Sequence, residues 1–431
     1  MTTAGVDAAP AAPPAAAAVA EVLAGGGVRS VFQPIVDLDT GAVTAYEALA
    51  RGPSGPLQKP DELFAAARAH GLLAELDEAC RSAAFRGARA AGLLAPHTVF
   101  VNVEPEVLGE TPPGAPLAAG GAAPDGLRIV LEITERALAA RPAELLRTVE
   151  RVRHLGWGVA LDDVGAETAS LAFMALLAPD VVKLDLRLVQ DRPSAAAAEV
   201  MHAVNSYAER SGAVVLAEGI ETPAHLATAR ALGATLGQGY LFGQPSAAPP
   251  LPERVQALTL GERGRRAGCG RTGSPFGCLP DDVVLRRAPK RLLIELSKQL
   301  EREAVRLGSS CVVTSTFQHG RHFTPSTRLR YQELAAHTGF VCALGEDLPE
   351  DPVPGVRGAR LVPGDPVLGE WDVVVLAPHF STALLARDLG DAGPDMDRGF
   401  EYALTYRRDT VTCAAQELMS RVVPHRPAVV G

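Results

Sequence analysis

The sequence predicts an α/β protein of two domains: a barrel of alternating strands and helices with an antiparallel first strand, followed by a smaller α/β domain. Its 431 residues exceed one ordinary hydrophobic core. Short β-branched runs alternate with longer Ala/Leu-rich segments from about residue 28 to residue 244. Between residues 246 and 274 the composition then shifts toward a linker, before a second α/β pattern begins.

Eight β-branched segments are the candidate strands of the first domain. They are SVFQPIVDL, AVTAYEALA, HTVFVNV, LRIVLEIT, WGVALDDV, DVVKLDL, AVVLAEGI and ATLGQGYLF. Segments between most of them, such as PAELLRTVERVRHLG, place apolar residues three and four positions apart, as helices that pack on a sheet do. Only a tight turn at residues 39–41 separates the first two strands, so we expect this pair to be antiparallel.

The second domain shows a shorter alternation of helices and strands. Its candidate elements are RLLIELSKQLEREA, SSCVVTSTF, RLRYQELAAH, WDVVVLAP and TCAAQELMSRV. We therefore predict five regions along the chain. They are a disordered Ala/Pro-rich tail at residues 1–18, the barrel at 19–252, a linker at 253–273, the second domain at 274–423 and a short tail at 424–431.

Charge and composition argue against several classes of partner. A formal net charge of −9 argues against DNA binding through a general basic field. No uncharged run reaches the ~18 to 20 residues that span a bilayer, and the first segment lacks the basic start of a signal peptide, so we expect no membrane anchor and a cytoplasmic protein. Six cysteines without a C-x-x-C pair indicate a reducing compartment, and we expect Cys269 and Cys278 to be free thiols.

Polar side chains stand where the predicted strands of the first domain end. They are Glu47, Asn102, Glu132, Asp162, Asp163, Lys183, Asp185, Glu218 and Gln238. In a parallel barrel the carboxyl ends of the strands gather on one face, so we expect these residues to share a site. Five of them are acids, apart from Asp185, and that many like charges cannot all stay ionised together without cations.

This set predicts a metal site with two divalent ions. Oxygen ligands without histidine or cysteine favour Mg²⁺, Mn²⁺ or Ca²⁺ over zinc. The adjacent pair Asp162 and Asp163 indicates two ions, the arrangement used for cleavage of phosphoesters, with Arg51 and Lys183 available to the phosphates. Taken singly, each acid is more often a helix cap or a solvated loop residue, and Asp185 is as readily a cap or a partner of Lys183. The set as a whole favours the shared site.

The first domain resembles the EAL family of cyclic di-GMP phosphodiesterases. The blocks FQPIVDLDTGAVTAYEALAR, NV, LEITE, DD, KLD, AEGIE and QGYLFGQP follow one another in the family's order. The resemblance covers residues 19–252. It implies a TIM-like (β/α)8 barrel that hydrolyses cyclic di-GMP to the linear dinucleotide pGpG with Mg²⁺ or Mn²⁺ in a two-metal site, often as a homodimer.

The resemblance also implies roles for individual residues. It makes Glu47, Asn102, Glu132 and Asp162 ligands of a first metal, and Asp162, Asp163 and Glu218 ligands of a second. Lys183 would orient the attacking water, and Glu218 is also a candidate for assisting its deprotonation. Substrate contacts are implied for Gln33, Leu49, Arg51 and Gln238, and bracing of the loop after the aspartates for Glu135.

One loop departs from the family pattern. After the aspartate pair the family usually continues as FGTGYSSL, whereas residues 164–171 read VGAETASL here. That loop links metal occupancy to the dimer contact in the family. A non-catalytic receptor of cyclic di-GMP, or a protein-interaction module built on a degenerate barrel, therefore stays open beside the enzyme. A general phosphatase or nuclease fits the metals but not the ordered motifs.

The second domain resembles the DICT sensory domains found beside such enzymes. The resemblance rests on VVTSTFQHGRHFTPSTRLRYQELA, WDVVVLAPHFSTALLARDL and FEYALTYRRDTVTCAAQEL. It implies a regulatory domain whose ligand or signalling partner is unknown. His319 and His322 form an H-x-x-H without a third ligand in view, so we do not expect a metal there.

Overall fold

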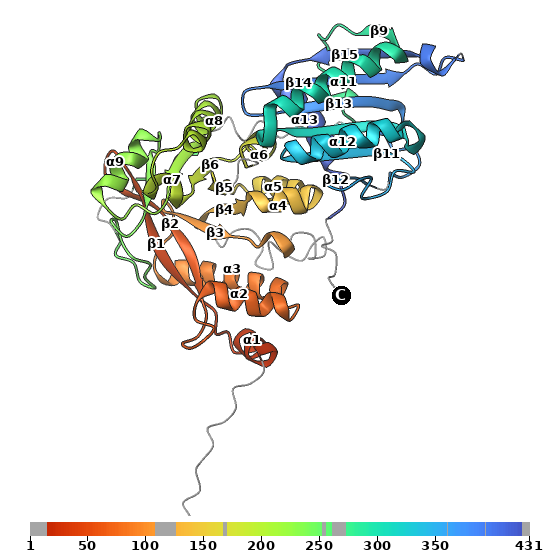
Figure 1. The fold of residues 1–431 in the computed structure, drawn as a ribbon. Helices are drawn as coiled ribbons and strands as arrows, with labels where there is room; N and C mark the ends of the chain where they lie inside the picture. Colours follow the sequence, from red (N-terminus) through yellow and green to blue (C-terminus); the bar gives the residue numbers. More distant parts are fainter. Residues whose placement is uncertain are drawn as a thin grey trace, which may run out of the picture.

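The computed structural model describes residues 15–107, 126–166, 170–251, 256–260, 273–359, 361–392 and 394–424. Within them the chain forms a closed eight-stranded barrel and, after it, a seven-stranded sheet. Figure 1 shows the barrel strands followed along the chain by the second sheet, drawn in cyan and blue. The predicted fold class, a barrel followed by a smaller α/β domain, is confirmed.

The barrel strands follow one another in chain order around the closed sheet. They are β1 (Arg29–Asp37), β2 (Val43–Arg51), β3 (Thr98–Asn102), β4 (Arg128–Thr134), β5 (Gly158–Val164), β6 (Val181–Leu184), β7 (Val214–Ala217) and β8 (Leu236–Gln238). β1 runs antiparallel to both β2 and β8, and the other neighbours are parallel. The expected antiparallel start is therefore present. It follows from the tight turn, because a parallel pair requires a longer crossover.

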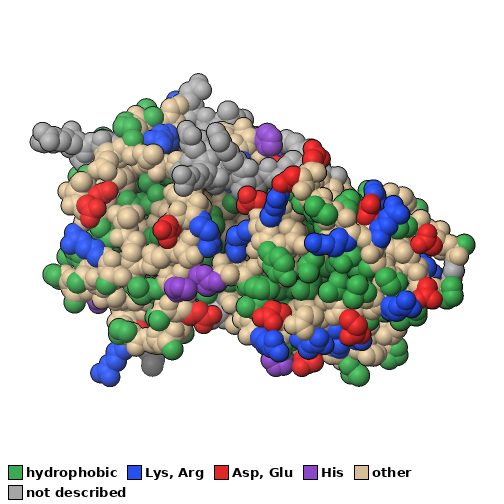
Figure 2. Space-filling view, turned by 90° about the horizontal axis from the view of Figure 1, so that it is seen from above, with side chains coloured by type: hydrophobic (Ala, Val, Ile, Leu, Met, Phe, Trp, Pro, Cys, Tyr) green, Lys and Arg blue, Asp and Glu red, His purple; other side chains and the backbone are tan. Residues whose placement is uncertain are grey.

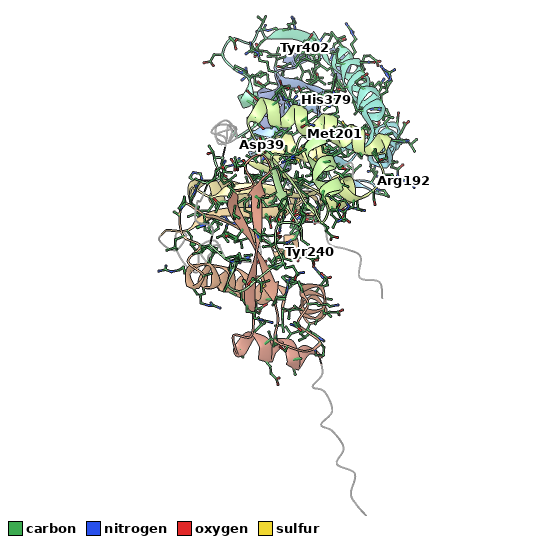
Figure 3. The ribbon with its side chains drawn as sticks, turned by 90° about the vertical axis from the view of Figure 1, so that its left-hand side faces the viewer. Asp39, Arg192, Met201, Tyr240, His379 and Tyr402 are labelled. Atoms are coloured by element: carbon green, nitrogen blue, oxygen red, sulfur yellow. A yellow bond between two sulfur atoms is a disulfide. The ribbon has the colours of Figure 1, made fainter. Side chains whose placement is uncertain are left out.

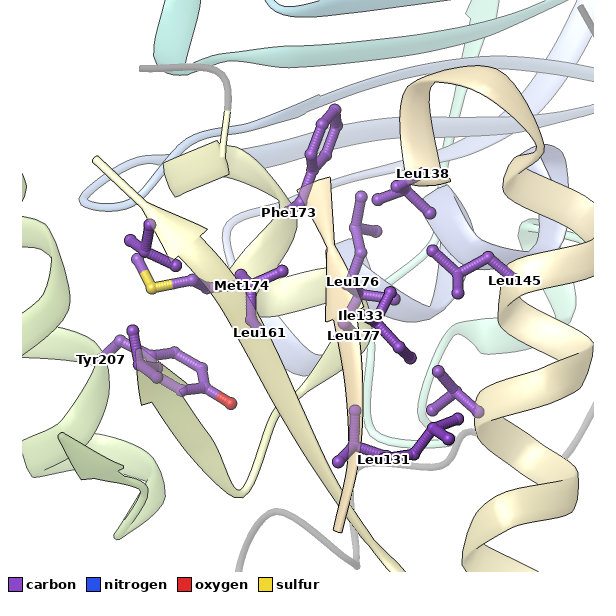
Figure 4. Close-up of a cluster of buried hydrophobic side chains, with 14 of the residues drawn as sticks. Leu131, Ile133, Leu138, Leu145, Leu161, Phe173, Met174, Leu176, Leu177 and Tyr207 are labelled. Atoms are coloured by element: carbon purple, nitrogen blue, oxygen red, sulfur yellow. The ribbon is translucent and has the colours of Figure 1, made fainter. Parts of the chain in front are cut away.

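Helices follow most of the strands. They are α1 (Ala15–Ala24), α2 (Pro60–Ala69), α3 (Leu73–Ala90), α4 (Glu135–Ala140), α5 (Pro142–His154), α6 (Ser170–Leu177), α7 (Leu186–Gln190), α8 (Ala195–Ser211) and α9 (Pro223–Ala231). The local sequence determines where several of these helices begin. The side chains of Ser194 and Thr222 accept hydrogen bonds from backbone amides at the first turns of α8 and α9. Figure 4 shows Met174 of α6 beside Leu161 of β5, and Leu176 and Leu177 of α6 near Ile133 of β4, all buried.

The barrel interior is filled by one apolar side chain from each strand. These are Ile35, Ala45, Phe100, Val130, Ala160, Val181, Leu216 and Leu236, joined by Leu258. Leu258 belongs to the segment predicted as a linker, yet only 4% of it is exposed, and its carbonyl accepts a hydrogen bond from Arg128 at 2.7 Å. Part of this segment thus packs on the barrel. The domain boundaries themselves stay a prediction.

The second sheet has the strand order β12-β11-β10-β13-β14-β15-β9. The strands are β9 (Arg286–Pro289), β10 (Val312–His319), β11 (Phe340–Glu346), β12 (Val356–Arg357), β13 (Glu370–Leu376), β14 (Ser381–Asp388) and β15 (Gly399–Thr405), and the helices are α11 (Lys290–Leu307), α12 (Pro325–His337) and α13 (Arg408–Met419). Side chains alternate between the faces of a strand. Val373 and Val375 of β13 accordingly pack in the core with residues of α11 and α12, whereas Val374 and Leu376 pack with α13.

The sheet of the second domain is joined to the barrel by a shared hydrophobic core. One buried cluster includes residues of α5, α6 and α8 together with Leu418 and Met419 of α13. At the edge of this junction the rings of His202 and His379 lie 4.3 Å apart, and Figure 3 shows His379 close to Met201 between the two parts. His202 is exposed on α8.

Cysteine pairing differs from the sequence-based expectation. Cys278, expected as a free thiol, forms a disulfide with Cys413 in α13, 135 residues away. Cys269 lies outside the described residues. The expectation was wrong for Cys278 because spacing along the chain carries no information about a partner that only the fold of the second domain brings near.

The surface and the helices show two further features. On the face drawn in Figure 2, Lys and Arg side chains are interspersed with Asp and Glu around an apolar area on the right-hand part. Among the described residues, no helix combines the length and the apolar character needed to cross a bilayer.

Candidate active site

The ends of four barrel strands and the loop after β7 bring ionisable side chains together. Glu47 lies in β2, Glu132 in β4, Asp162 in β5 and Lys183 in β6, while Glu218 follows β7 directly. Because these ends point the same way around a closed barrel, side chains distant in sequence converge. They are also withdrawn from water: Lys183 and Glu132 are each only 1% exposed. The predicted convergence of acids at one rim is therefore present.

The ammonium group of Lys183 is the centre of this cluster. Its Nζ lies 2.6 Å from Glu132 Oε1, 2.8 Å from Glu218 Oε1, 3.0 Å from Asp162 Oδ1 and 3.7 Å from Glu47 Oε1. One positive charge thus faces four carboxylates. Burial of so many charges is costly unless each one is compensated, and a single cation cannot compensate four anions.

The protonation equilibria of two acids reflect this excess of negative charge. Burial raises the pKa of Glu132 well above its usual range, and the charges of Glu47 and Asp162 raise it further, against the opposing effect of Lys183. Burial also raises the pKa of Glu218 to about 8, assisted by the charges of Asp162 and Glu47. Both carboxyls therefore favour the protonated form at neutral pH when no further cation is present.

Glu47 and Lys183 are shifted toward their charged forms. Burial acts to raise the pKa of Glu47, but the charge of Lys183 and hydrogen bonds from Gln238 and Asn102 outweigh it, so the pKa is lowered. For Lys183, burial acts to lower the pKa, but the surrounding carboxylates, Asp162 first, raise it well above its usual range. Glu47 and Lys183 therefore remain a charged pair inside the barrel mouth.

The donor set fits divalent cations. Asp162, Asp163 and Glu218 each place one carboxylate oxygen within 4.8 Å of the others, close enough to share an ion. Oε2 of Glu132 is buried and has no hydrogen-bond partner among the described residues. Carboxylate oxygens are the ligands that Mg²⁺, Mn²⁺ and Ca²⁺ prefer, and a bound cation would satisfy the oxygen of Glu132 and the excess negative charge together.

Two consecutive aspartates reach one site because β5 is irregular at this point. In a regular strand Asp162 and Asp163 would point to opposite faces. The pairing of β5 with β6 shifts register between Leu161 and Val164, and Asp163 adopts a φ of 57°, in the left-handed region. Asp tolerates this conformation better than most residues, and its amide donates a hydrogen bond to Asp162 Oδ1 at 3.0 Å.

Amide side chains fix Glu47 from the neighbouring strands. Gln238 Nε2 donates to Glu47 Oε2 at 2.6 Å and to Gln33 Oε1 at 3.1 Å, and Asn102 Nδ2 donates to Glu47 Oε1 at 3.2 Å. Gln33 pairs directly with Glu47 in the antiparallel ladder of β1 and β2. These contacts hold the carboxylate in one orientation, as the hydrogen-bonded partners of metal ligands do.

Comparison with known protein families shows to which family the chain is related. The profile of the family described as EAL domain matches residues 16–245, more than half of the chain. The chain belongs to the EAL domain family. A second profile, described as a sensory domain in diguanylate cyclases and two-component systems (DICT), matches residues 282–389, which lie in the second domain.

Named relatives match the EAL domain and little else. Cyclic di-GMP phosphodiesterase NbdA of Pseudomonas aeruginosa is 33% identical over 238 residues, covering 52% of this chain and 30% of the relative. Cyclic di-GMP phosphodiesterase RocR of the same organism is 29% identical over 240 residues, covering 54% of this chain and 61% of the relative. The match to each relative thus spans less than two thirds of its length.

Solved structures are similar over the same region. One is that of Klebsiella pneumoniae BlrP1, whose title describes a complex with manganese and cyclic di-GMP. It is 29% identical and has a TM-score of 0.46, covering 51% of this chain and 56% of the other.

Three expected substrate contacts lie along one strand pair of the EAL domain. Leu49 and Arg51 follow Glu47 in β2 at two-residue intervals, so the three side chains emerge on one face. Both are half-buried, and Arg51 Nη1 donates to the carbonyl of Ala50 at 2.7 Å. Gln33 stands opposite Glu47. The structure thus places these residues beside the acids without testing what they bind.

One predicted residue, Asp185, has a different role in the structure. Asp185 accepts a hydrogen bond from the amide of Arg187 at 2.8 Å and caps α7, which is the structural alternative considered for it. The side chain of Glu135 lies outside the described residues, as do residues 167–169 of the departing loop. Loop bracing by Glu135 therefore stays a prediction.

Sequence analysis missed two glycines that position site residues in the EAL domain. Gly239 follows Gln238, and a Cβ there would lie 2.1 Å from the carbonyl oxygen of Ile220. Gly219 follows Glu218 with a φ of 67°, and a Cβ would lie 2.6 Å from Cβ of Leu186. In both cases the backbone approach requires glycine. A glycine directly after a functional residue at a strand end was the signal available in the sequence.

Proposed function

We propose that the EAL domain hydrolyses one phosphodiester bond of cyclic di-GMP and releases the linear dinucleotide pGpG. The observation that carries this proposal is the cluster around Lys183, in which one buried ammonium faces four carboxylates in a barrel of this family. Relatives named as cyclic di-GMP phosphodiesterases match the same region, which supports the substrate. The activity is proposed for the EAL domain alone, because the match covers only part of those relatives.

The acids would hold two divalent cations, Mg²⁺ or Mn²⁺. Glu47, Asn102, Glu132 and Asp162 would hold the first, and Asp162, Asp163 and Glu218 the second. Cations bound there would supply charge neutralisation at the phosphoryl group and a lowered pKa for water.

The chain's own residues would bind the nucleotide and handle the proton. Cations bound at the site would favour the ionised form of Glu218, whose carboxylate could then take a proton from water, and Lys183, 2.8 Å away, would orient that water. Arg51 would meet a phosphate with its planar guanidinium, and Gln33 and Leu49 would contact the nucleotide from the same strand pair. Gln238 would keep Glu47 in place through its 2.6 Å hydrogen bond.

We further propose that the second domain regulates the EAL domain through α6. This helix begins at Ser170, within the departing segment 164–171, which itself follows the aspartate pair. α13 packs on α6 and shares its hydrophobic core. A displacement of α13 would therefore act on the loop beside Asp162 and Asp163. We also propose that the protein is a homodimer, as the family resemblance implies, and that it lies in the cytoplasm, as the absence of a basic signal-peptide start in the sequence suggests.

Chromatography of reaction products tests the proposed activity. Purified full-length protein is incubated with cyclic di-GMP and Mg²⁺ or Mn²⁺, beside Glu47→Gln and the exposed control Glu78→Gln from α3. We expect pGpG from the wild type and the control. Glu47→Gln should lower turnover more than about a hundredfold. Loss of a residue that only hydrogen-bonds to a metal ligand typically costs about 10- to 100-fold, and Glu47 would itself be a ligand.

The alternatives give different results in the same experiment. Saturable binding of cyclic di-GMP with no product under either metal would indicate a receptor rather than an enzyme. The altered loop 164–171 is the observation that supports this alternative. Absence of nucleotide binding would favour a protein-interaction module. Repeating the assay on a chain ending at residue 260, which keeps Leu258 in the barrel interior, separates an inactive barrel from one inhibited by the second domain.

A further inference from the structure

The second domain contains a cavity that no role described so far uses. It encloses about 710 Å³ between α11, α12 and strands β10 and β13 of the sheet. Lys290, Ile294, Ser297 and Glu301, at three- and four-residue spacing, present one face of α11 to it. Cavities of about 300 to 1,000 Å³ are the size that small organic ligands occupy.

Aromatic rings form rigid walls of this cavity. Tyr331 and Phe317 lie edge to face with centroids 5.2 Å apart, and both pack in the same way against Phe323 behind them. The indole of Trp371 donates a hydrogen bond to Ser297 Oγ at 3.0 Å, and its ring packs edge to face on Phe400. Because these contacts fix the rings without an occupant, the walls are preorganised for a flat apolar group.

The charges that line the cavity are mainly positive. Its four cationic side chains are Lys290, Lys298, Arg321 and Arg330, and its two carboxylates are Glu301 and Asp395. Each carboxylate already has a cationic partner: Asp395 accepts from Lys290 at 2.7 Å, and Glu301 accepts from Arg330 at 2.7 Å. The two charges within each pair cancel, so the net charge of the cavity depends on the two remaining cations, Arg321 and Lys298.

Arg321 is the lining cation whose charge is not balanced by an ion pair with a described residue. It is exposed in the short 3-10 turn at Gly320–His322, and it forms no ion pair with any described residue. Lys298, the remaining lining cation, forms an ion pair with Glu295, which does not line the cavity. His322 adds no charge at neutral pH, because burial lowers its pKa. An anionic group at the cavity mouth would therefore meet the guanidinium of Arg321, with Lys298 nearby.

We propose that this cavity binds a small organic anion with an aromatic body, whose ring lies among Phe317, Tyr331 and Trp371 and whose anionic group pairs with Arg321. The apolar walls would contact the aromatic body of the ligand, and the surplus of positive charge would attract its anionic group. An occupant would touch Trp371 and Val373 of β13, the strand whose opposite face packs against α13. The proposal concerns binding alone and does not depend on hydrolysis in the EAL domain.

Calorimetric titration of the full-length chain with 2-naphthoate tests the site. We expect saturable binding of one molecule per chain with a Kd on the order of 0.1 to 1 mM, as the size of this probe allows. The neutral analogue 2-naphthamide and the variant Arg321→Gln should each weaken binding about tenfold or more, the usual effect of losing a charge-assisted hydrogen bond. Arg321 is exposed, so its replacement leaves the fold intact.

Arg328→Gln is the matched control. Arg328 is an exposed arginine of α12 that does not line the cavity, and its guanidinium lies over the ring of Phe323 at 5.8 Å. We expect this variant to bind 2-naphthoate like the wild type. Absence of saturable heat, equal affinity for 2-naphthamide, unchanged binding by Arg321→Gln, or an equal loss in Arg328→Gln would each overturn the proposal.

Discussion

The side-chain amide of Gln416 in α13 donates a hydrogen bond to the backbone carbonyl of Leu176 in α6 at 2.6 Å. Leu176 lies near the end of a helix whose last four carbonyls have no partner within it, so this bond satisfies a group that would otherwise need water. It links the second domain to the helix that follows the aspartates of the EAL domain. The contact therefore joins the predicted sensor to the predicted catalytic site.

Gln416→Leu should weaken this junction. Loss of one hydrogen bond to a half-buried carbonyl lowers the free energy of unfolding by about 1 kcal/mol. Because α6 follows the loop beside Asp163, we also expect a changed rate of cyclic di-GMP hydrolysis. Urea unfolding and product chromatography measure the two effects. Gln299→Leu, in the exposed part of α11, is the control, and identical behaviour of both variants would remove the link between α13 and α6.

Lys183→Met should make folding depend strongly on divalent metal. Without the ammonium, the carboxylates Glu132, Asp162 and Glu218 lose their common partner, and breaking a buried ion pair typically costs about 3 to 5 kcal/mol. Added Mn²⁺ stabilises a protein that binds it only when folded. The rise in Tm on adding Mn²⁺ should therefore be larger in Lys183→Met than in the wild type. Equal rises would contradict a metal site at these acids.

Asp163→Asn should weaken the metal site while preserving the backbone. Asn also tolerates a positive φ, so the irregular turn of β5 remains, but one anionic ligand is lost. We expect Mn²⁺ affinity measured by calorimetry to fall by at least about tenfold. Asp185→Asn, at the end of the next strand, should keep the wild-type affinity, because Asn still caps α7. A similar loss in both variants would point to a general charge effect.

The junction between the domains should lose stability at acidic pH. Burial lowers the pKa of His379, and the neighbouring positive groups His202, Arg210 and Arg408 lower it further, whereas Glu199 on α8 is the acid beside it. The folded state thus disfavours the protonated ring. The contribution of His379 is complete above its unfolded pKa of about 6.5 and declines as pH falls below that value.

Urea unfolding at pH 7.5 and pH 5.5 measures this decline. His379→Gln should reduce the difference between the two pH values relative to the wild type, because the variant has no ring to protonate at the junction. His70→Gln, at an exposed position after α2, is the control and should leave the difference unchanged. An undiminished difference in His379→Gln would assign the acid sensitivity elsewhere.

Cys413→Ala should destabilise the second domain under non-reducing conditions. The disulfide with Cys278 closes a loop of 135 residues, and such cross-links typically contribute about 2 to 4 kcal/mol. The Tm of the wild type should fall to that of the variant when dithiothreitol is added, and the variant should not respond. Cys80→Ala, at a half-buried free cysteine of α3, is the control. A Tm insensitive to reductant in every form would exclude the cross-link.

The sequence alone determined the barrel and the gathering of acids at its rim. Strand and helix periodicity is local, and the acids follow the strands directly, so the shared rim could be predicted from Glu47, Glu132, Asp162 and Glu218 without coordinates. The antiparallel first strand was equally local, because a tight turn permits no parallel pairing.

The tertiary structure decided what depends on contacts between distant segments. It showed that the register shift and positive φ at Asp163 turn two consecutive aspartates into one site. It paired Cys278 with Cys413, joined Gln416 to Leu176 and left a cavity beside Trp371. Each of these arises from packing between elements far apart in the chain, and packing geometry is not encoded in the spacing of residue types.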